Sequence, residues 1–207
     1  MNKDDMIKLF ESVKNSEIEI EEAMKKIEDL PFSDLGFANI DSHREIRVGY
    51  PEVIYCAGKT VEQVKGIVQF MMTKDSNIVA TRASEEMYCA VKEICKEASY
   101  NHQGRIITVR KREEKLTESY IAIISAGTSD LPVVEEAAET ALILGNRVEK
   151  IVDVGVAGIH RLFSKLDIIR GAKVIIVVAG MEGALASVVG GLVNKPIIAV
   201  PTSVGYG

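Results

Sequence analysis

The second half of the chain contains four short runs rich in valine and isoleucine, and a glycine-containing loop follows each of them. The runs span residues 120–124, 151–154, 174–178 and 197–200. Few polar residues interrupt them, which is typical of parallel strands buried on both faces. Helical patterns separate the runs, so the order strand, loop, helix repeats. The sequence therefore predicts a doubly wound parallel sheet with helices on both faces, a three-layer α/β fold.

The four loops are expected to form one binding site. In a doubly wound sheet ligands bind at the carboxyl ends of the strands, where all four loops fall. We number these loops 1 to 4 in chain order. They read Ser-Ala-Gly-Thr-Ser-Asp at 125–130, Gly-Val-Ala-Gly-Ile-His at 155–160, Ala-Gly-Met-Glu-Gly at 179–183 and Pro-Thr-Ser-Val-Gly-Tyr-Gly at 201–207.

Loop 1 has the composition of a phosphate site. Its hydroxyls and backbone N–H groups precede a predicted helix, with Asp130 as the expected cap and Pro132 in the first turn. A phosphate is expected at such a helix N-terminus, although similar clusters cap many helices that bind no ligand. The residues predicted to bind are Ser125, Gly127, Thr128, Ser129 and Asp130.

The other loops add groups that could act on a substrate. The region of loop 2 supplies Asp153, His160 and Arg161; the histidine could carry a proton and the arginine could hold an anion, or both could simply cap or solvate a helix. Glu182 of loop 3 is interpreted as a general base or a substrate-orienting group, the alternative being a charge that favours the helix dipole. The remaining predicted binding residues are Gly155, Gly158, Gly180, Met181, Gly183, Ala184, Thr202 and Ser203.

A smaller α/β domain is predicted over residues 1–112, and the doubly wound domain over residues 113–207. The charged segment 110–118 is the candidate linker. Ser16 is the expected N-cap of a helix at 17–30, and Thr60 with Gln63 matches a capping box. The capping box precedes a predicted amphipathic helix through residues 64–71, and residues 47–55 are interpreted as a loop leading into a strand. The other predicted elements are helices at 4–13 and 84–98 and strands at 77–81 and 105–109.

Composition excludes several classes of function. The 25 lysines and arginines are outnumbered by 30 aspartates and glutamates, so no basic face suggests nucleic acid. No apolar leader or bilayer-length run is present, which favours a cytoplasmic protein with no membrane partner. Three cysteines, Cys56, Cys89 and Cys95, lack metal-ligand spacing and argue against a disulfide framework.

Several of these motifs resemble the LarB family. Residues 125–130, 156–161, 178–185 and 198–207 are similar to its catalytic domain, which itself resembles PurE, the aminoimidazole ribonucleotide carboxylase. Upstream, the stretches at 41–44, 47–54 and 58–60 resemble the N-terminal domain of that family, which PurE lacks. The resemblance covers nearly the whole chain after residue 30.

The resemblance implies the first step of nickel-pincer nucleotide cofactor synthesis. Such enzymes carboxylate nicotinic acid adenine dinucleotide at pyridinium C5, with CO2 or bicarbonate as co-substrate, and hydrolyse its phosphoanhydride to give pyridinium-3,5-biscarboxylate mononucleotide and AMP. The resemblance further implies a homo-octamer and no tightly bound cofactor, with Mg2+ as a candidate ion and no metal-ligand set assigned.

The resemblance also suggests roles for particular residues. Loop 1 would hold a phosphate and its ribose, with Gly155, Gly158, His160 and Arg161 forming the opposite wall. Glu182 would face the pyridinium and remove the C5 proton, with His160 as the second catalytic candidate. Arg44, Arg47 and Lys59 would reach the dinucleotide or a neighbouring subunit, or else form interdomain salt bridges.

The chemistry also demands a nucleophile. A pyridinium ring is electron-poor, so a nucleophile must add to it before it can attack CO2. In the family this is a cysteine in an Asn-Ser-Cys stretch beyond loop 4, and the sequence stops before such a stretch. None of Cys56, Cys89 and Cys95 matches its position. We therefore expect the chain as given to bind the dinucleotide without turning it over.

Two other functions stay open at this stage. One is a PurE-type carboxylase or mutase, against which stand the N-terminal domain and the Ile-His-Arg-Leu sequence at 159–162, where PurE has Ala-His-Arg-Thr-Pro. The other is a nucleotide-binding module without catalysis.

Overall fold

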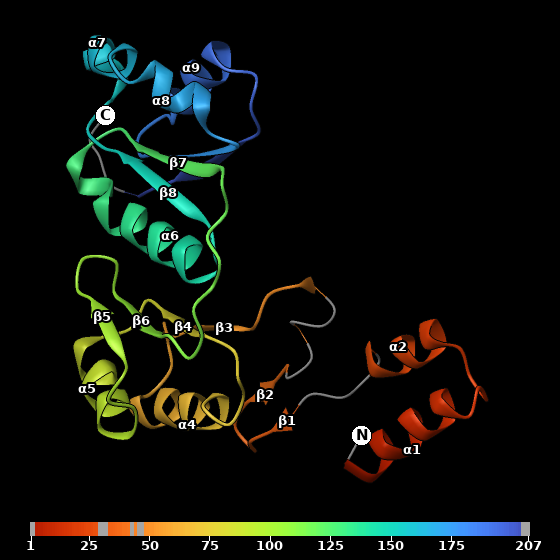
Figure 1. Ribbon diagram of the computed structural model, residues 1–207. Helices are drawn as coiled ribbons and strands as arrows, with labels where there is room; N and C mark the ends of the chain where they lie inside the picture. Colours follow the sequence, from red (N-terminus) through yellow and green to blue (C-terminus); the bar gives the residue numbers. More distant parts are fainter. Residues whose placement is uncertain (1–2, 29–32, 42–43, 45–47, 204–207) are drawn as a thin grey trace. The chain divides into compact units, whose positions relative to one another are not determined.

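The computed structural model describes residues 3–28, 33–41, 44 and 48–203 (Figure 1). It divides into two compact units, Met1–Val53 and Ile54–Gly207. The domain boundary predicted at 112/113 stays a prediction.

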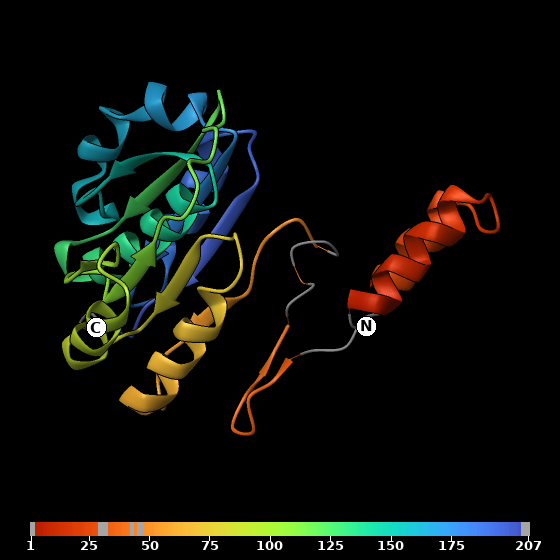
Figure 2. The same cartoon turned by 60° about the horizontal axis from the view of Figure 1, so that its bottom comes forward.

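The first unit contains a helix pair and a short hairpin. Helices α1 (Lys3–Lys14) and α2 (Ile20–Glu28) contact each other, and strand β1 (Ser33–Asp34) pairs antiparallel with β2 (Asn39–Ile40), seen as the orange hairpin of Figure 2. The predicted N-cap at Ser16 is wrong. Its φ of 56° is left-handed, whereas an N-cap residue takes extended angles, so Ser16 lies in the connecting turn and the helix begins at Ile20. The predicted helix end at Leu30 falls outside the described residues.

A small four-stranded sheet opens the second unit. Its order is β3-β4-β6-β5, and β6 pairs antiparallel with both β4 and β5. The capping box of Thr60 and Gln63 is confirmed, with Gln63 N donating to Thr60 Oγ1 at 3.2 Å and Thr60 N donating to Gln63 Oε1 at 3.0 Å. The elements are β3 (Val53–Tyr55), α4 (Val61–Met71), β4 (Ile78–Thr81), α5 (Glu85–Ile94), β5 (Ser99–Asn101) and β6 (Ile106–Val109).

Two details of this sheet differ from the prediction. Helix α5 ends at Ile94 rather than near residue 98, because Cys95 is extended with φ −140° and ψ 98°. The edge strand β5 was not predicted. It is only three residues long and contains Asn101, so its period-two pattern is too short to recognise.

The rest of the second unit contains the predicted parallel sheet. Its order is β10-β9-β7-β8, and all three neighbouring pairs are parallel. The strands are β7 (Tyr120–Ser125), β8 (Arg147–Ile151), β9 (Val174–Ala179) and β10 (Ile197–Pro201); the helices are η1 (Thr128–Asp130), α6 (Leu131–Ile143), η2 (Val156–Gly158), α7 (Ile159–Phe163), α8 (Leu166–Gly171) and α9 (Ala184–Leu192). The α/β fold class is confirmed.

Successive residues of the central strand β7 serve the two faces of this sheet. Ile123 packs with Val134 of α6, whereas Ile124 packs with Leu162 of α7 and Leu185 of α9. This follows from the alternation of side chains along a strand. Figure 1 shows α6 on one face and α7, α8 and α9 on the other, which is the three-layer arrangement.

The second predicted strand was misplaced. Residues 151–154 were expected to form it, but β8 covers Arg147–Ile151 and Val154 lies in the following loop. Because β8 is an edge strand with one neighbour, it carries exposed polar residues that break the apolar pattern. The sequence pattern for a strand buried on both faces therefore could not locate it.

Asn77, next to β4 of the small sheet, forms hydrogen bonds with the predicted linker and with the end of α6. Its side chain is buried, and its Oδ1 accepts hydrogen bonds from the backbone N–H groups of Lys111 at 2.8 Å and Arg112 at 3.1 Å. Its Nδ2 donates to the carbonyl of Ile143 at 3.4 Å, at the end of α6. The start of the linker is therefore anchored.

Asn77→Ala is expected to lower the free energy of unfolding by about 2 kcal/mol, because two backbone N–H groups lose their shared acceptor at a buried site. Urea denaturation measures this loss. The matched control is Asn194→Ala, at an exposed asparagine. Equal denaturation midpoints for the two variants would show that Asn77 does not contribute to stability in this way.

Among the described residues, no helix combines the length and the apolarity needed to cross a lipid bilayer.

Candidate functional site

Loop 1 leaves the centre of the parallel sheet at the end of β7. Ser125 is completely buried there, and the backbone N–H of Ala126 donates to the carbonyl of Val178 on β9 at 3.1 Å. Within the described part of the chain, the Ser125 hydroxyl is buried without a hydrogen-bond partner. Buried polar groups nearly always have a partner, so a water or ligand atom is expected beside it.

Asp130 connects loop 1 to loop 4. Its carboxylate is buried, with only 3% of the residue exposed, and accepts hydrogen bonds from Gly127 N at 3.1 Å and from Thr202 Oγ1 at 2.7 Å. Thr202 N donates in turn to the carbonyl of Ala179, at the end of β9, at 3.0 Å. Asp130 therefore joins the loops that follow β7 and β10, and Thr202 in turn connects them to the end of β9.

Asp130 does not cap α6 as expected; its carboxylate accepts a hydrogen bond from the N–H of Gly127 at the start of η1 instead. Although it stands at the N-cap position of α6, its side chain makes no capping hydrogen bond there. The side chain turns back to Gly127 and across to Thr202 instead. Pro132 does lie in the first turn, as predicted. The N–H groups of Thr128 and Ser129 open this helical segment, and the first N–H groups of a helix have no partner within it.

Loop 2 packs directly on loop 1. Val154 N donates to the carbonyl of Ser125 at 3.0 Å, and a Cβ added to Gly155 would lie 2.8 Å from the carbonyl oxygen of Ala126. That separation is shorter than real Cβ atoms show, so the two loops can approach this closely only because residue 155 is glycine. The first two predicted loops are thus joined through their backbones.

Arg161 forms an ion pair within loop 2. Its Nη1 donates to Asp153 Oδ2, and its guanidinium lies against Gly158, where an added Cβ would be 2.6 Å from Nε. Asp153 has a left-handed backbone, with φ 58°. The sequence analysis identified both residues but did not predict their ion pair, because a 3-10 turn separates them and their spacing matches no motif.

Loop 3 presents Glu182 to solvent. The loop makes a turn in which Gly183 N donates to the carbonyl of Gly180 at 3.1 Å, and both Met181 and Gly183 have positive φ. Met181 and Glu182 are exposed, and Ala184 begins α9. His160 is exposed on α7. Neither Glu182 nor His160 forms a side-chain hydrogen bond or ion pair found in the described structure.

Comparison with known proteins matches both parts of the chain. Residues 32–112 match the LarB/PurE-like N-terminal domain, and residues 120–206 match the AIR carboxylase domain. An uncharacterized protein of Methanocaldococcus jannaschii is 35% identical over 209 residues, which cover 96% of this chain and 81% of that protein. The chain belongs to the LarB/PurE-like family. It is therefore related to a family of carboxylases.

The LarB/PurE-like assignment does not by itself give roles to residues, but the structure shows which predicted residues lie together. Loops 1, 2 and 4 are connected through Ser125, Gly127, Asp130, Gly155 and Thr202. Ser203 is exposed beside Thr202. The binding and catalytic roles of all these residues stay predictions.

Three further candidates, Arg44, Arg47 and Lys59, lie in the first half of the chain. Arg44 is exposed in the first unit, and Arg47 lies outside the described residues. Lys59 N donates to the carbonyl of Cys56 at 3.0 Å, in the turn that precedes α4. Their expected contacts with a dinucleotide or a neighbouring subunit stay predictions.

The three cysteines all belong to the part of the chain that precedes the parallel sheet. Burial raises the pKa of the Cys56 thiol to about 11, while the Lys59 ammonium partly opposes this shift. A thiol with such a pKa is protonated at neutral pH and is a poor nucleophile. Cys95 is buried at the end of α5, and Cys89 is exposed on that helix. In the described ranges, no cluster of three His, Cys, Asp or Glu side chains could hold a metal ion.

Gly155→Ala is expected to reduce stability by about 1–3 kcal/mol, because the new methyl group would clash with the Ala126 carbonyl and separate loops 1 and 2. Its φ of −60° allows alanine, so the clash is the only new cost. Urea denaturation measures the loss. Gly191→Ala adds the same methyl group where nothing lies within 4 Å, and it should be neutral or stabilising. An equally stable Gly155 variant would contradict the close approach.

Proposed function

We propose that the protein carboxylates nicotinic acid adenine dinucleotide at pyridinium C5 and hydrolyses its phosphoanhydride, releasing AMP and pyridinium-3,5-biscarboxylate mononucleotide. This would be the first step of nickel-pincer nucleotide synthesis. The observation that carries the proposal is the presence in one chain of the LarB/PurE-like N-terminal domain and the AIR carboxylase domain. The carboxylase domain alone would fit a PurE-type enzyme equally well.

The buried end of loop 1 supports binding of a phosphate and ribose. The Asp130 carboxylate is already held by Gly127 and Thr202, so it can order the loop before a ligand arrives. The N–H groups at the start of η1 and α6 carry the positive end of the helix dipole, which favours a phosphate. The Ser125 hydroxyl supplies a further hydrogen-bonding group at the base of the loop, with no partner among the described residues.

The reaction would proceed in balanced steps. A nucleophile adds to the pyridinium ring and makes it an enamine-like dihydropyridine, whose C5 then attacks CO2 and forms the new carbon–carbon bond. A base removes the C5 proton, and departure of the nucleophile with its bonding electrons restores the aromatic pyridinium. Water cleaves the phosphoanhydride separately. We assign Glu182 as the base, with His160 as a second proton carrier, and assign the nucleophile to none of Cys56, Cys89 and Cys95.

The remaining parts of the proposal concern assembly and conditions. We propose a cytoplasmic homo-octamer that uses CO2 or bicarbonate and holds no tightly bound cofactor, with Mg2+ as a candidate ion for the pyrophosphate. Arg161 forms an ion pair with Asp153, so an anion bound at Arg161 would share the guanidinium group with the Asp153 carboxylate. Light scattering after size-exclusion chromatography tests the octamer.

The proposed activity is tested by incubating the full-length protein with nicotinic acid adenine dinucleotide and isotopically labelled bicarbonate, followed by mass spectrometry. AMP and a labelled biscarboxylate mononucleotide are the expected products. Conversion of aminoimidazole ribonucleotide instead would indicate the PurE-type reaction. Dinucleotide binding without a labelled product would indicate a binding module.

A further inference from the structure

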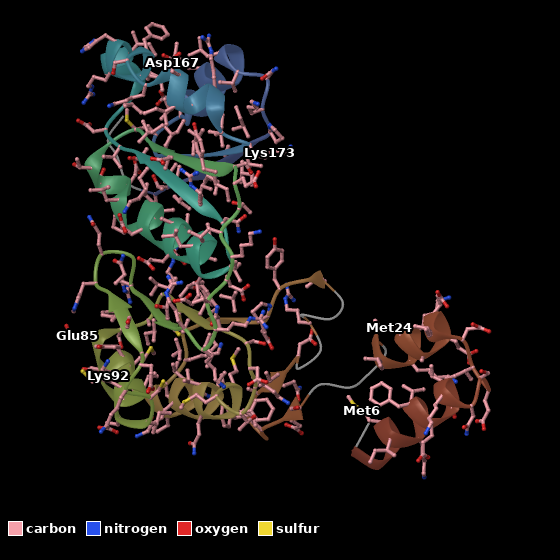
Figure 3. All side chains as sticks on the ribbon, in the orientation of Figure 1. Met6, Met24, Glu85, Lys92, Asp167 and Lys173 are labelled. Atoms are coloured by element: carbon pink, nitrogen blue, oxygen red, sulfur yellow. The ribbon has the colours of Figure 1, made fainter. Side chains whose placement is uncertain are left out.

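Helix α6 packs between the two sheets of the second unit. One side of it contributes Val134 and Ala138 to the core beneath the parallel sheet. Ile143, at its end, packs with Val79 and Ile106 of the small sheet. Helix α5, on which Figure 3 labels Lys92, packs against α4. Because α6 contacts both sheets, a shift of the small sheet would act on the helix that begins at loop 1.

The turn between β5 and β6 lies directly on the first half of α6. A Cβ added to Gly104 would be 2.9 Å from the backbone N of Glu136 and 3.0 Å from the carbonyl carbon of Glu135. These are backbone atoms of a helix, which cannot move aside as the end of a flexible side chain could. Only glycine therefore allows this approach of the turn to α6.

Asn101 forms one hydrogen bond within that turn and two to the helix. Its Oδ1 accepts from Gly104 N at 2.8 Å, and its Nδ2 donates to Glu135 Oε2 at 3.1 Å and to Glu139 Oε1 at 3.4 Å. Arg82, at the end of β4, pairs with Glu136 at 2.7 Å. The small sheet thus contacts three acidic side chains of α6, those of Glu135, Glu136 and Glu139.

These contacts lie close to the site along the helix. Glu135 follows Asp130 by five residues, which corresponds to about 7.5 Å along the axis of a helix. A helix transmits a displacement over such a length with little bending. The position of the small sheet is therefore coupled to that of Asp130 and the N–H groups of loop 1.

We propose that the small sheet positions the ligand-binding end of α6, with Gly104 and Asn101 as positioning residues for loop 1. A part of the chain that contributes no described side chain to the loops thereby sets their geometry. The phosphate-containing ligand rests on the proposed function above. The mechanical coupling itself does not depend on which ligand binds.

Two variants disturb the contact by different means. Gly104→Ala inserts a methyl group against the backbone of α6, and Asn101→Asp replaces a donating amide with a carboxylate facing Glu135 and Glu139. The matched controls make the same chemical changes elsewhere: Gly191→Ala in open space and Asn194→Asp at an exposed position. Thermal unfolding identifies conditions in which all four variants are folded.

The first readout is hydrogen exchange of the Gly127 and Asp130 amides, which form hydrogen bonds within loop 1. Faster exchange is expected in both test variants and in neither control. The second readout is titration with nicotinic acid adenine dinucleotide, for which affinity is expected to fall about tenfold or more, as for the loss of one hydrogen bond to a charged group. In the full-length enzyme, the loss should appear in KM more than in kcat.

The two readouts separate the two proposals. Unchanged loop 1 exchange in folded Gly104→Ala and Asn101→Asp would overturn the positioning role, whatever ligand binds. Wild-type protein that fails to bind the dinucleotide would instead refute the proposed function, while faster exchange in the two variants would still support the coupling. Equal exchange changes in the controls would also overturn the positioning role.

Discussion

Replacing Glu182 with glutamine is expected to lower turnover of nicotinic acid adenine dinucleotide by about 10²- to 10⁴-fold, the usual contribution of a positioned acid or base. Glutamine keeps the shape of the side chain but cannot accept the C5 proton. Dinucleotide affinity should stay nearly constant, because Glu182 is exposed and its loop is shaped by Gly180 and Gly183 rather than by the carboxylate. Labelled product formation by the full-length protein measures the effect.

The control for this prediction is Asp167→Asn on α8. It removes an exposed carboxylate from a helix outside the four loops, labelled in Figure 3, and should leave turnover unchanged. Full activity in the Glu182→Gln variant would reduce Glu182 to a charge near the start of α9. Loss of dinucleotide binding in that variant would assign it a binding role instead.

The second large effect is expected at Asp130. Asp130→Ala removes a buried acceptor from Gly127 N and Thr202 Oγ1, and hydrogen bonds to charged groups contribute about 1.5–3 kcal/mol each. We expect the free energy of unfolding to fall by about 3 kcal/mol, more than the roughly 1 kcal/mol that loss of a helix cap costs. Dinucleotide affinity should fall as well, because loop 1 loses its connection to loop 4.

Two further variants separate the contributions of the two Asp130 hydrogen bonds to this effect. Asp130→Asn retains the shape and one acceptor and should lose about half as much stability, while Thr202→Val removes only the connection to loop 4. Urea denaturation and calorimetric titration on the folded variants provide the measurements. Wild-type stability in Asp130→Ala would contradict the bridging role, and unchanged affinity in a folded variant would remove Asp130 from the binding site.

Three of the four strands of the parallel sheet, including the edge strand β10, were predicted to within one residue. Strands β7 and β9 lie inside the parallel sheet, and their valine and isoleucine runs predicted them to within one residue. Strand β8 was misplaced because this edge strand exposes polar residues such as Arg147 and Glu149. The predicted start of α2 was also wrong, because a serine occurs in turns as readily as at helix N-caps.

The sequence alone determined the fold class, the family resemblance and the loops that should form a site, because buried strands and glycine-containing loops leave local patterns. Tertiary structure decided what each loop residue contacts. The Asp130 carboxylate accepts hydrogen bonds from Gly127 and from Thr202, which lies 72 residues beyond Asp130. Asn101 of β5 donates to Glu135 of α6, 34 residues further along the chain. Such pairings depend on how separate elements pack, and no local spacing in the sequence encodes them.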